Sequence, residues 1–253
     1  MVIAEKINKL GIKTLDIWFC HDFSEIEKLK ADIIRIAGVG DKFLGFDLQK
    51  KNGVQDTLIT DLSKDENNIF SSFSSTVRNE IRKADKIGIK YMVFQNEINS
   101  EIKKQFIECY SSMYSSKGIK VFSPLWSLDL YEKNNALTIT VAYYEEKPVV
   151  YHVYVNDGKN SRLLYSCSDF RKDTGNKTVI GNANRGLHFF DIKHFKKSGY
   201  AILDWGGVFS LKEPNNIDKF KLSFGGSPLT YYNLEKYSLK GKLFETIVGL
   251  IKK

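Results

Sequence analysis

The sequence predicts an α/β protein in which a mixed, mostly antiparallel twisted sheet is flanked by helices and preceded by a small N-terminal α/β lobe. Three strand patterns follow one another closely and are joined by short turns, and helical patterns stand on both sides of them. A polar stretch before these elements separates them from the N-terminal part. The expected organisation is a lobe at 1–68, a main domain at 69–235 and a C-terminal helix at 236–253 that packs on the lobe.

A capping box opens a predicted helix in the lobe. Ser24 is followed three residues later by Glu27, and apolar residues recur at helical spacing to about residue 37. Two short apolar runs separated by an Asn-Gly turn then predict a β-hairpin, with the runs at 43–48 and 54–59 and the turn at 52–53.

Hydrophobic spacing and turn residues predict the main domain element by element. Apolar residues three or four positions apart predict a helix over 70–84, which Gly88 ends. Pro124 suits the first turn of a helix, and Gly199 ends another. From residue 89 the predicted order is a strand at 89–94, helices at 100–116 and 124–134, strands at 137–144, 149–155 and 161–168, a helix at 178–198, a strand at 200–204 broken by Gly206-Gly207, a helix at 215–222, a strand at 229–234 and a helix at 239–251.

Composition restricts the class of protein and its partners. The net charge of +8 favours anionic partners such as RNA, pyrophosphates or an anionic membrane surface. Cys20, Cys109 and Cys167 are odd in number and widely spaced, so neither a disulfide framework nor a zinc motif is predicted, and a reducing compartment fits best. Neither a secretion signal nor a membrane-spanning run is recognised, so we expect a cytoplasmic protein without a metal site.

Three short motifs occur in order along the main domain. Residues 78–88 read RNEIRKADKIG, residues 203–207 read LDWGG and residues 220–226 read FKLSFGG. They resemble the basic helix that opens the second GNAT domain of Fem-type aminoacyl transferases, the aspartate, aromatic and double-glycine turn of those enzymes, and their FKxxFGG segment. The predicted element order also resembles the GNAT acyltransferase fold. This resemblance implies that residues 1–68 stand in place of a truncated first GNAT domain.

The resemblance also implies roles for residues in these motifs. Lys221 is expected at the acyl-transfer centre, where it binds the anionic substrate or stabilises the oxyanion. Asp204 is expected to orient the attacking amine, with capping of the glycine turn as the alternative. Arg78, Arg82 and Lys83 are expected to bind an anionic substrate or donor, with a solvated helix face as the alternative.

Further candidates lie on the predicted strands and on the loop before the long helix. Tyr151, His152, Tyr165 and Trp205 are candidate substrate-binding residues. Because side chains alternate along a strand, Tyr151 and His152 are expected on opposite faces of the sheet. The loop at 169–177 is basic but departs from the pyrophosphate-binding signature of coenzyme A-dependent GNAT proteins, which favours aminoacyl-tRNA over acyl-CoA as donor. Its candidate donor-binding residues are Arg171, Gly175, Asn176 and Lys177.

These residues predict an N-acyltransferase without a tightly bound cofactor. It is expected to transfer an aminoacyl or acyl group to an amine of a cell-envelope precursor, free or lipid-linked, which is either a peptidoglycan stem peptide or an amino sugar of a surface polysaccharide. Direct attack is expected, since no nucleophile motif is recognised. The alternatives are an acyl-CoA-dependent N-acetyltransferase acting on a nucleotide-linked amino sugar, and a non-catalytic GNAT-like module that binds RNA or protein. For the C-terminal helix, peripheral membrane contact is the alternative to packing on the lobe.

Overall fold

The computed structural model describes residues 1–50, 53–119, 124–168 and 176–251. The chain forms two units: Met1–Thr57 together with Leu229–Lys253, and Leu58–Pro228. The two ends of the chain therefore belong to one unit, which we call the terminal unit, and the intervening residues form the central unit. These boundaries fall earlier in the sequence than the predicted ones after residues 68 and 235.

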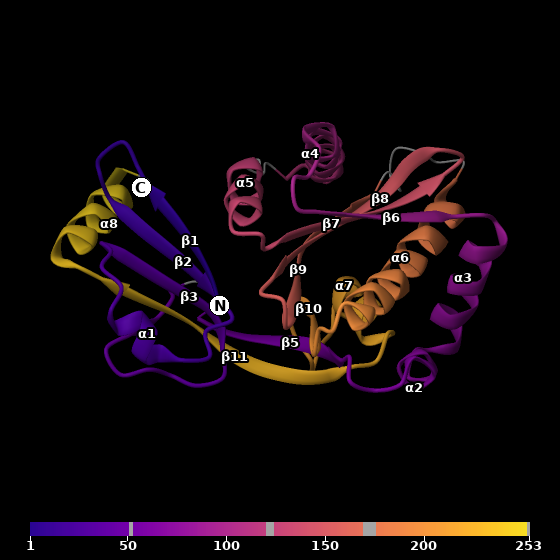
Figure 1. The fold of residues 1–253 in the computed structure, drawn as a ribbon, viewed down its shortest axis with the longest axis horizontal. Helices are drawn as coiled ribbons and strands as arrows, with labels where there is room; N and C mark the ends of the chain where they lie inside the picture. The colour runs from indigo at the N-terminus through magenta and orange to yellow at the C-terminus, as the bar shows by residue number, and fades with distance from the viewer. Residues whose placement is uncertain (51–52, 120–123, 169–175, 252–253) are drawn as a thin grey trace. The chain divides into compact units, whose positions relative to one another are not determined.

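The terminal unit is a sheet with a helix on one face. Strands β1 (Val2–Ile7) and β2 (Lys13–Trp18) are antiparallel, β3 (Ile33–Val39) is parallel to β2, and β11 (Ser227–Tyr237) is antiparallel to β3 and to the short β4 (Asp47–Leu48). Helix α8 (Leu239–Ile251) lies along this sheet, and α1 (Phe23–Glu27) follows β2 (Figure 1).

Helix α8 is held against the N-terminal strands by close packing and by a salt bridge. Arg35 of β3 and Glu245 of α8 are 3.1 Å apart. A Cβ added to the buried Gly241 would lie 2.1 Å from the carbonyl oxygen of Asp32, so the helix backbone and the start of β3 are in direct contact. On the other face of the sheet, beside α1, a core contains Leu15, Ile17, Ile26, Ile36 and Leu234, among others.

Two predictions for the N-terminal part are wrong. The predicted helix from Ser24 to residue 37 is only the five-residue α1, whose N-cap is Asp22, and its second half is the strand β3. The β-branched residues Ile33 and Ile36 pair with strands on both sides, so sheet pairing overrides their helical spacing. The predicted hairpin is also absent among the described residues, because β4 pairs with β11; Asn52 lies outside them. The second run is the predicted strand, β5 (Val54–Asp61).

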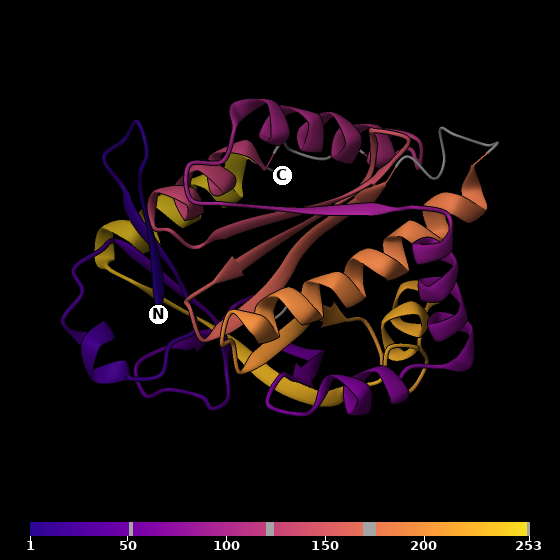
Figure 2. The same ribbon diagram turned by 45° about the vertical axis from the view of Figure 1, so that its right-hand side comes forward.

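The central unit contains a mixed sheet between two layers of helices. Its strands run in the order β10-β9-β8-β7-β6, and all neighbours are antiparallel except β9 and β10. Helices α6 (Lys177–Lys197) and α3 (Ser75–Lys86) cover one face, and α4 (Ser100–Ser115) and α5 (Leu125–Lys133) cover the other (Figures 1 and 2). The strands are β6 (Lys90–Gln95), β7 (Leu137–Tyr144), β8 (Lys147–Asn156), β9 (Asn160–Ser168) and β10 (Ile202–Val208), and the remaining helices are α2 (Glu66–Ser71) and α7 (Asn216–Leu222).

The predicted element order from residue 89 onward is confirmed, and the predicted fold class with it. Two details differ. The helix predicted over 70–84 is divided into α2 and α3, because Ser74 leaves the helix and caps α3 with its hydroxyl on the N–H of Val77. Strand β10 does not end at Gly206-Gly207 but continues to Val208.

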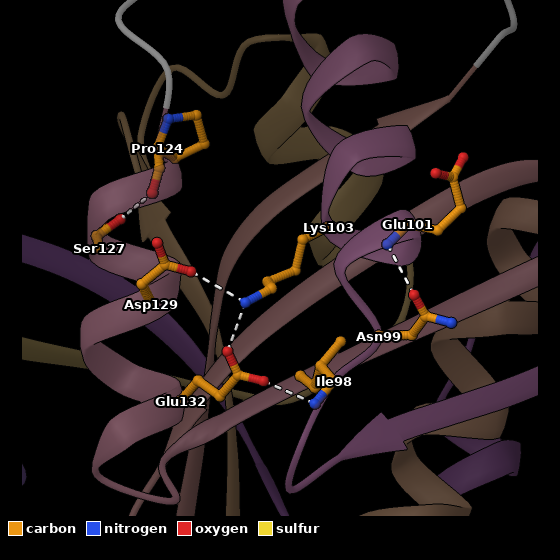
Figure 3. Close-up of polar contacts among 8 residues, drawn as sticks. All are labelled: Ile98, Asn99, Glu101, Lys103, Pro124, Ser127, Asp129 and Glu132. Carbon is orange, nitrogen blue, oxygen red and sulfur yellow. Dashed lines mark hydrogen bonds and ion pairs between the residues drawn. The ribbon is translucent and has the colours of Figure 1, made fainter.

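A partly buried lysine joins the two helices on one face of the central sheet. The ammonium of Lys103 on α4 lies 3.0 Å from Asp129 and 2.6 Å from Glu132, both on α5 (Figure 3). The second oxygen of Glu132 accepts the N–H of Ile98, just before α4, at 2.6 Å. These contacts fix α5 against α4, and Glu132 and Asp129 raise the pKa of Lys103.

All three cysteines are free thiols. Among the described residues, no helix combines the length and the apolarity that a bilayer-spanning segment requires.

Candidate functional site

The candidate site lies where two parallel strands stop pairing. Strands β9 and β10 are paired at Asn160–Ile202, Ser161–Leu203 and Arg162–Asp204. Beyond this last pair β10 continues to Val208 and β9 to Ser168, and β9 also contains a bulge at Leu164, where its register with β8 shifts. Polar backbone groups become available to a ligand where neighbouring parallel strands separate.

A buried ion pair marks the end of the paired segment. The guanidinium of Arg162 donates to Oδ2 of Asp204, and only 8% and 13% of the two side chains are exposed. Oδ1 of Asp204 accepts the N–H of Gly206 at 2.8 Å. Both carboxylate oxygens of Asp204 are thus engaged, and the turn-capping alternative is the geometry observed.

The two glycines after Asp204 allow close backbone contacts. Gly206 has a φ of +75°, and a Cβ there would lie 2.8 Å from the carbonyl oxygen of Leu163. Only glycine meets both conditions without strain. The carbonyl oxygen of Gly207 accepts a hydrogen bond from Nζ of Lys221 at 2.8 Å. The glycine turn therefore positions the lysine.

Lys221 is a half-buried cation on α7 whose charge is only partly balanced. Burial, and then the positive charge of Arg162, lowers the pKa of Lys221 to about 8, while Asp204 and Asp218 act in the opposite direction. One of its three donors is used by Gly207, and a lysine poised in this way can bind an anion or exchange a proton near neutral pH.

Asp218 organises the loop that precedes α7. Its buried carboxylate accepts the N–H groups of Phe209 at 3.0 Å and Ser210 at 3.3 Å, and Asn215 and Asp218 form a reciprocal capping box. Lys221 lies one turn further along the same short helix. This network therefore fixes the position of the backbone from which the Lys221 side chain extends.

A buried histidine network lies beside the site. Nδ1 of His152 is 2.7 Å from Oδ2 of Asp191, which also accepts the hydroxyl of Tyr154 at 2.6 Å. Nε2 of His152 is 2.9 Å from Oδ1 of Asn184. The ring of His188 lies 4.0 Å from that of His152.

His188 connects this network to the aromatic residues around Lys221. Its ring lies 4.8 Å from Trp205 and 5.2 Å from Phe224. Burial, followed by the charges of His152, Lys221 and Arg185, lowers the pKa of His188 well below its usual range, so the ring is neutral at physiological pH.

His152, His188 and Asp191 are also close enough to be considered as a cation site, since their ligand atoms lie within 4.8 Å of one another. Both nitrogens of His152 already have hydrogen-bond partners, whereas a metal ligand needs a free lone pair. The observed geometry is therefore that of a hydrogen-bonded network.

The structure separates the predicted substrate-binding residues. Tyr151 and His152 lie on opposite faces of the sheet, as strand alternation predicts: the Tyr151 hydroxyl donates to Gln105 of α4, whereas His152 contacts α6. Tyr165 packs edge-on against Tyr110 of α4. Trp205 is fully buried, and its indole N–H donates to Thr60 at 2.9 Å.

The basic helix makes most of its polar contacts locally. Arg78 donates to the carbonyl oxygens of Ser71, at 3.0 Å, and Phe73. Arg82 contacts Asn79 and the ring of Phe70, and Lys83 is exposed. None of these contacts joins Arg78 or Arg82 to Lys221. Another charged residue of this helix, Glu80, forms an ion pair with Arg185 of α6.

The predicted donor-binding loop lies mostly outside the described residues, including Arg171 and Gly175. Asn176 is the N-cap residue of α6, and Lys177, its first residue, is exposed. In any α-helix the first N–H groups have no partner within the helix, so a helix N-terminus can bind an anion.

Sequence reasoning did not select Arg162, Asn184, Asp191 or Asp218. A charged residue inside a strongly apolar strand or helix is a usable signal, because such a residue is seldom buried without a partner. Arg162 and Asp191 are both charged residues of this kind, but their partners are distant in the sequence, so the sequence does not identify them.

Comparison with solved structures shows which known folds this chain resembles. The crystal structure of FemX matches with a TM-score of 0.65 and 15% identity over 96% of this chain and 85% of that chain. The C-terminal domain of a putative lysylphosphatidylglycerol synthetase from Agrobacterium fabrum matches with a TM-score of 0.57 and 11% identity over 98% and 89%. L-PGS from Bacillus licheniformis matches with 0.53 and 12% over 96% and 87%.

The predicted resemblance to Fem-type, GNAT-like proteins is therefore confirmed at the level of the fold. No protein-family model matches the chain, and no curated protein matches it.

Proposed function

We propose that the chain is an N-acyltransferase that transfers an aminoacyl or acyl group to an amine of a cell-envelope precursor, and that Lys221 acts at the acyl-transfer centre. The observation that carries the proposal is the position of Lys221, a half-buried ammonium beside Arg162 at the place where β9 and β10 stop pairing. The likeness to FemX supports the same class of reaction.

In the proposed reaction the acceptor amine attacks the carbonyl carbon of the donor directly. The new C–N bond forms, the bond from carbon to the leaving oxygen or sulfur breaks, and the proton lost by the amine ends on that leaving atom. Lys221 donates a hydrogen bond to the oxyanion formed in between. The Arg162–Asp204 pair and Asp218 keep the lysine in position.

A charge-removing substitution tests this role. Lys221→Met should lower the rate of product formation by roughly a hundredfold or more, as for loss of an oxyanion donor. Lys219→Met is the matched control, since Lys219 is an exposed lysine on the same helix. Mass spectrometry of amine acceptors incubated with aminoacyl-tRNA or acyl-CoA supplies the readout. Equal rates for the two variants would refute the role of Lys221.

The donor is proposed to be aminoacyl-tRNA, because the loop before α6 departs from the coenzyme A signature and the net charge of +8 suits a nucleic acid. Calorimetry with acetyl-CoA tests this part separately: micromolar affinity would favour the alternative, transfer from acyl-CoA. A wild-type protein that is inert with every donor would favour a binding module.

A further inference from the structure

Helix α8 has an apolar face that none of the described residues covers. Its inner side carries the buried Gly241 and the partly buried Phe244 and Val248. Its outer side carries four large apolar residues with high exposed fractions: Leu239 89%, Leu243 64%, Ile247 47% and Leu250 69%. A surface helix ordinarily places its apolar residues on the inner side only.

The four exposed residues form one continuous stripe. They are spaced by four, four and three positions, and at 3.6 residues per turn they fall within about 80° of the helix circumference. This arrangement is a second amphipathic face on a helix that already uses its first face for packing.

The apolar surface continues onto the neighbouring turn between β1 and β2. Nζ of Lys240 donates to the carbonyl oxygen of Gly11 at 2.8 Å, which joins the first turn of α8 to this turn. Leu10, next to Gly11, is 73% exposed. The turn that carries Leu10 therefore lies beside the first turn of α8.

Most charges around this surface are positive, although Nζ of Lys240 lies 3.5 Å from a carboxylate oxygen of Asp32. Lys240 and Lys242 lie on opposite sides of the stripe, and the exposed Lys9 precedes Leu10. The one acidic residue of α8, Glu245, is turned toward Arg35. A stripe of leucine and isoleucine with lysines at its margins matches the boundary of an anionic bilayer, where lipid tails meet negative headgroups.

A second copy of the chain is a poorer occupant. Thirteen residues make a helix about 20 Å long and about 10 Å wide, so its outer face offers about 200 Å², whereas a stable dimer buries about 800 Å² on each partner. The lysines at the margins would also face each other.

We propose that the outer face of α8, together with the Leu10 turn, docks on the surface of an anionic membrane. The helix lies in the plane of the interface, with Leu243 and Ile247 in the acyl region and Lys240 and Lys242 at the headgroups. This inference does not depend on the proposed acyl transfer.

Co-sedimentation with vesicles tests the proposal. The wild-type chain should sediment with vesicles of phosphatidylcholine and phosphatidylglycerol, and much less with phosphatidylcholine alone. Leu243→Ser/Ile247→Ser should weaken binding roughly tenfold or more. The control, Leu44→Ser/Met92→Ser, removes two exposed apolar side chains elsewhere and should bind like wild type. Lys242→Gln should reduce only the part of binding that needs phosphatidylglycerol.

Two results would overturn the proposal. One is the same sedimentation for the α8 variant and its control, or none for the wild-type chain, with circular dichroism showing that all are folded. The other is a wild-type dimer in sedimentation equilibrium that Leu243→Ser/Ile247→Ser dissociates, which would assign the stripe to a second copy.

Discussion

At the scale of single residues, Asp204 and Asp218 only partly balance the positive charge of Lys221. The proposed role requires the ammonium form, yet burial and Arg162 lower the pKa of Lys221 to about 8. The charged fraction therefore decreases as the pH rises through that value. We expect kcat/KM to fall above a pH of about 8, and Lys221→Arg, if active, to keep its activity to higher pH because arginine stays protonated. A rate that instead increases through pH 8 would indicate a general base.

The Arg162–Asp204 pair should be important for stability because both side chains are nearly buried. Asp204→Asn removes the carboxylate charge but keeps an acceptor for the N–H of Gly206, so it should cost about 3 kcal/mol of unfolding free energy. Asp204→Ala also loses the turn hydrogen bond and should cost about 1 kcal/mol more. Urea unfolding measures both. Equal costs for the two variants would show that the Gly206 contact contributes nothing.

Among the residues of the candidate site, those in local motifs could be selected from the sequence, and those in long-range networks could not. Asp204 and Lys221 lie near glycines and aromatic residues that identify them in the sequence, and the structure brings them together. The partner of Asp204 is Arg162, which is 42 positions earlier and becomes its neighbour only when β9 and β10 pair. The same holds for Asp191, which His152 meets across the layer between sheet and helix.

At the scale of elements, the contact of α6 with α3 and β6 depends on Gly186. A Cβ added there would lie 1.9 Å from the hydroxyl oxygen of Tyr91 and 3.1 Å from Cβ of Ala84. Gly186→Ala should therefore destabilise the protein by about 1–3 kcal/mol, despite the roughly 1 kcal/mol that alanine gains over glycine in a helix.

Tyr91→Phe supplies the matched test, since the Tyr91 hydroxyl is buried without a hydrogen-bond partner among the described residues. Alone it should be neutral or slightly stabilising. Combined with Gly186→Ala it should recover part of the loss in thermal unfolding. If the effects of the two substitutions on stability were strictly additive, the alanine methyl group would not be clashing with the Tyr91 hydroxyl.

Elements were predictable where one periodicity dominated, and less so where tertiary pairing decided. Strand β7 and helix α8 have the predicted bounds, because their patterns are long and clearly bounded. In β3, Ile33 and Ile36 have helical spacing by coincidence, and pairing with β2 and β11 makes the segment a strand. Apolar spacing alone could not show that Ser74 interrupts the helix over 70–84.

At the scale of the whole molecule, the two units should respond separately to a local change. Gly241→Ala would place a methyl group 2.1 Å from the carbonyl oxygen of Asp32, and so should push α8 away from the terminal unit. Hydrogen exchange followed by mass spectrometry should then show faster exchange in β1, β2 and β3, by roughly tenfold, and unchanged exchange in β7 and β8. Uniform acceleration in both units would mean that they unfold together.

The domain boundaries could not be read from composition. The polar stretch at 63–68 looks like a linker, but it lies within the central unit, just before and at the start of α2. The boundaries between the two compact units fall inside β5 and β11, two strands that run from one unit into the other. A strand shared in this way has no change of composition at the crossing.

The membership of both chain ends in the terminal unit has a consequence for how the protein is made. Synthesis proceeds from the N-terminus, so β1, β2 and β3 leave the ribosome before the central unit, and β11 and α8 leave after it. The central unit is therefore complete in the nascent chain before β3 receives its partner β11. The terminal unit, although its strands are made earlier, can finish folding only after the central unit has been made, and one edge of β3 stays unpaired in the meantime.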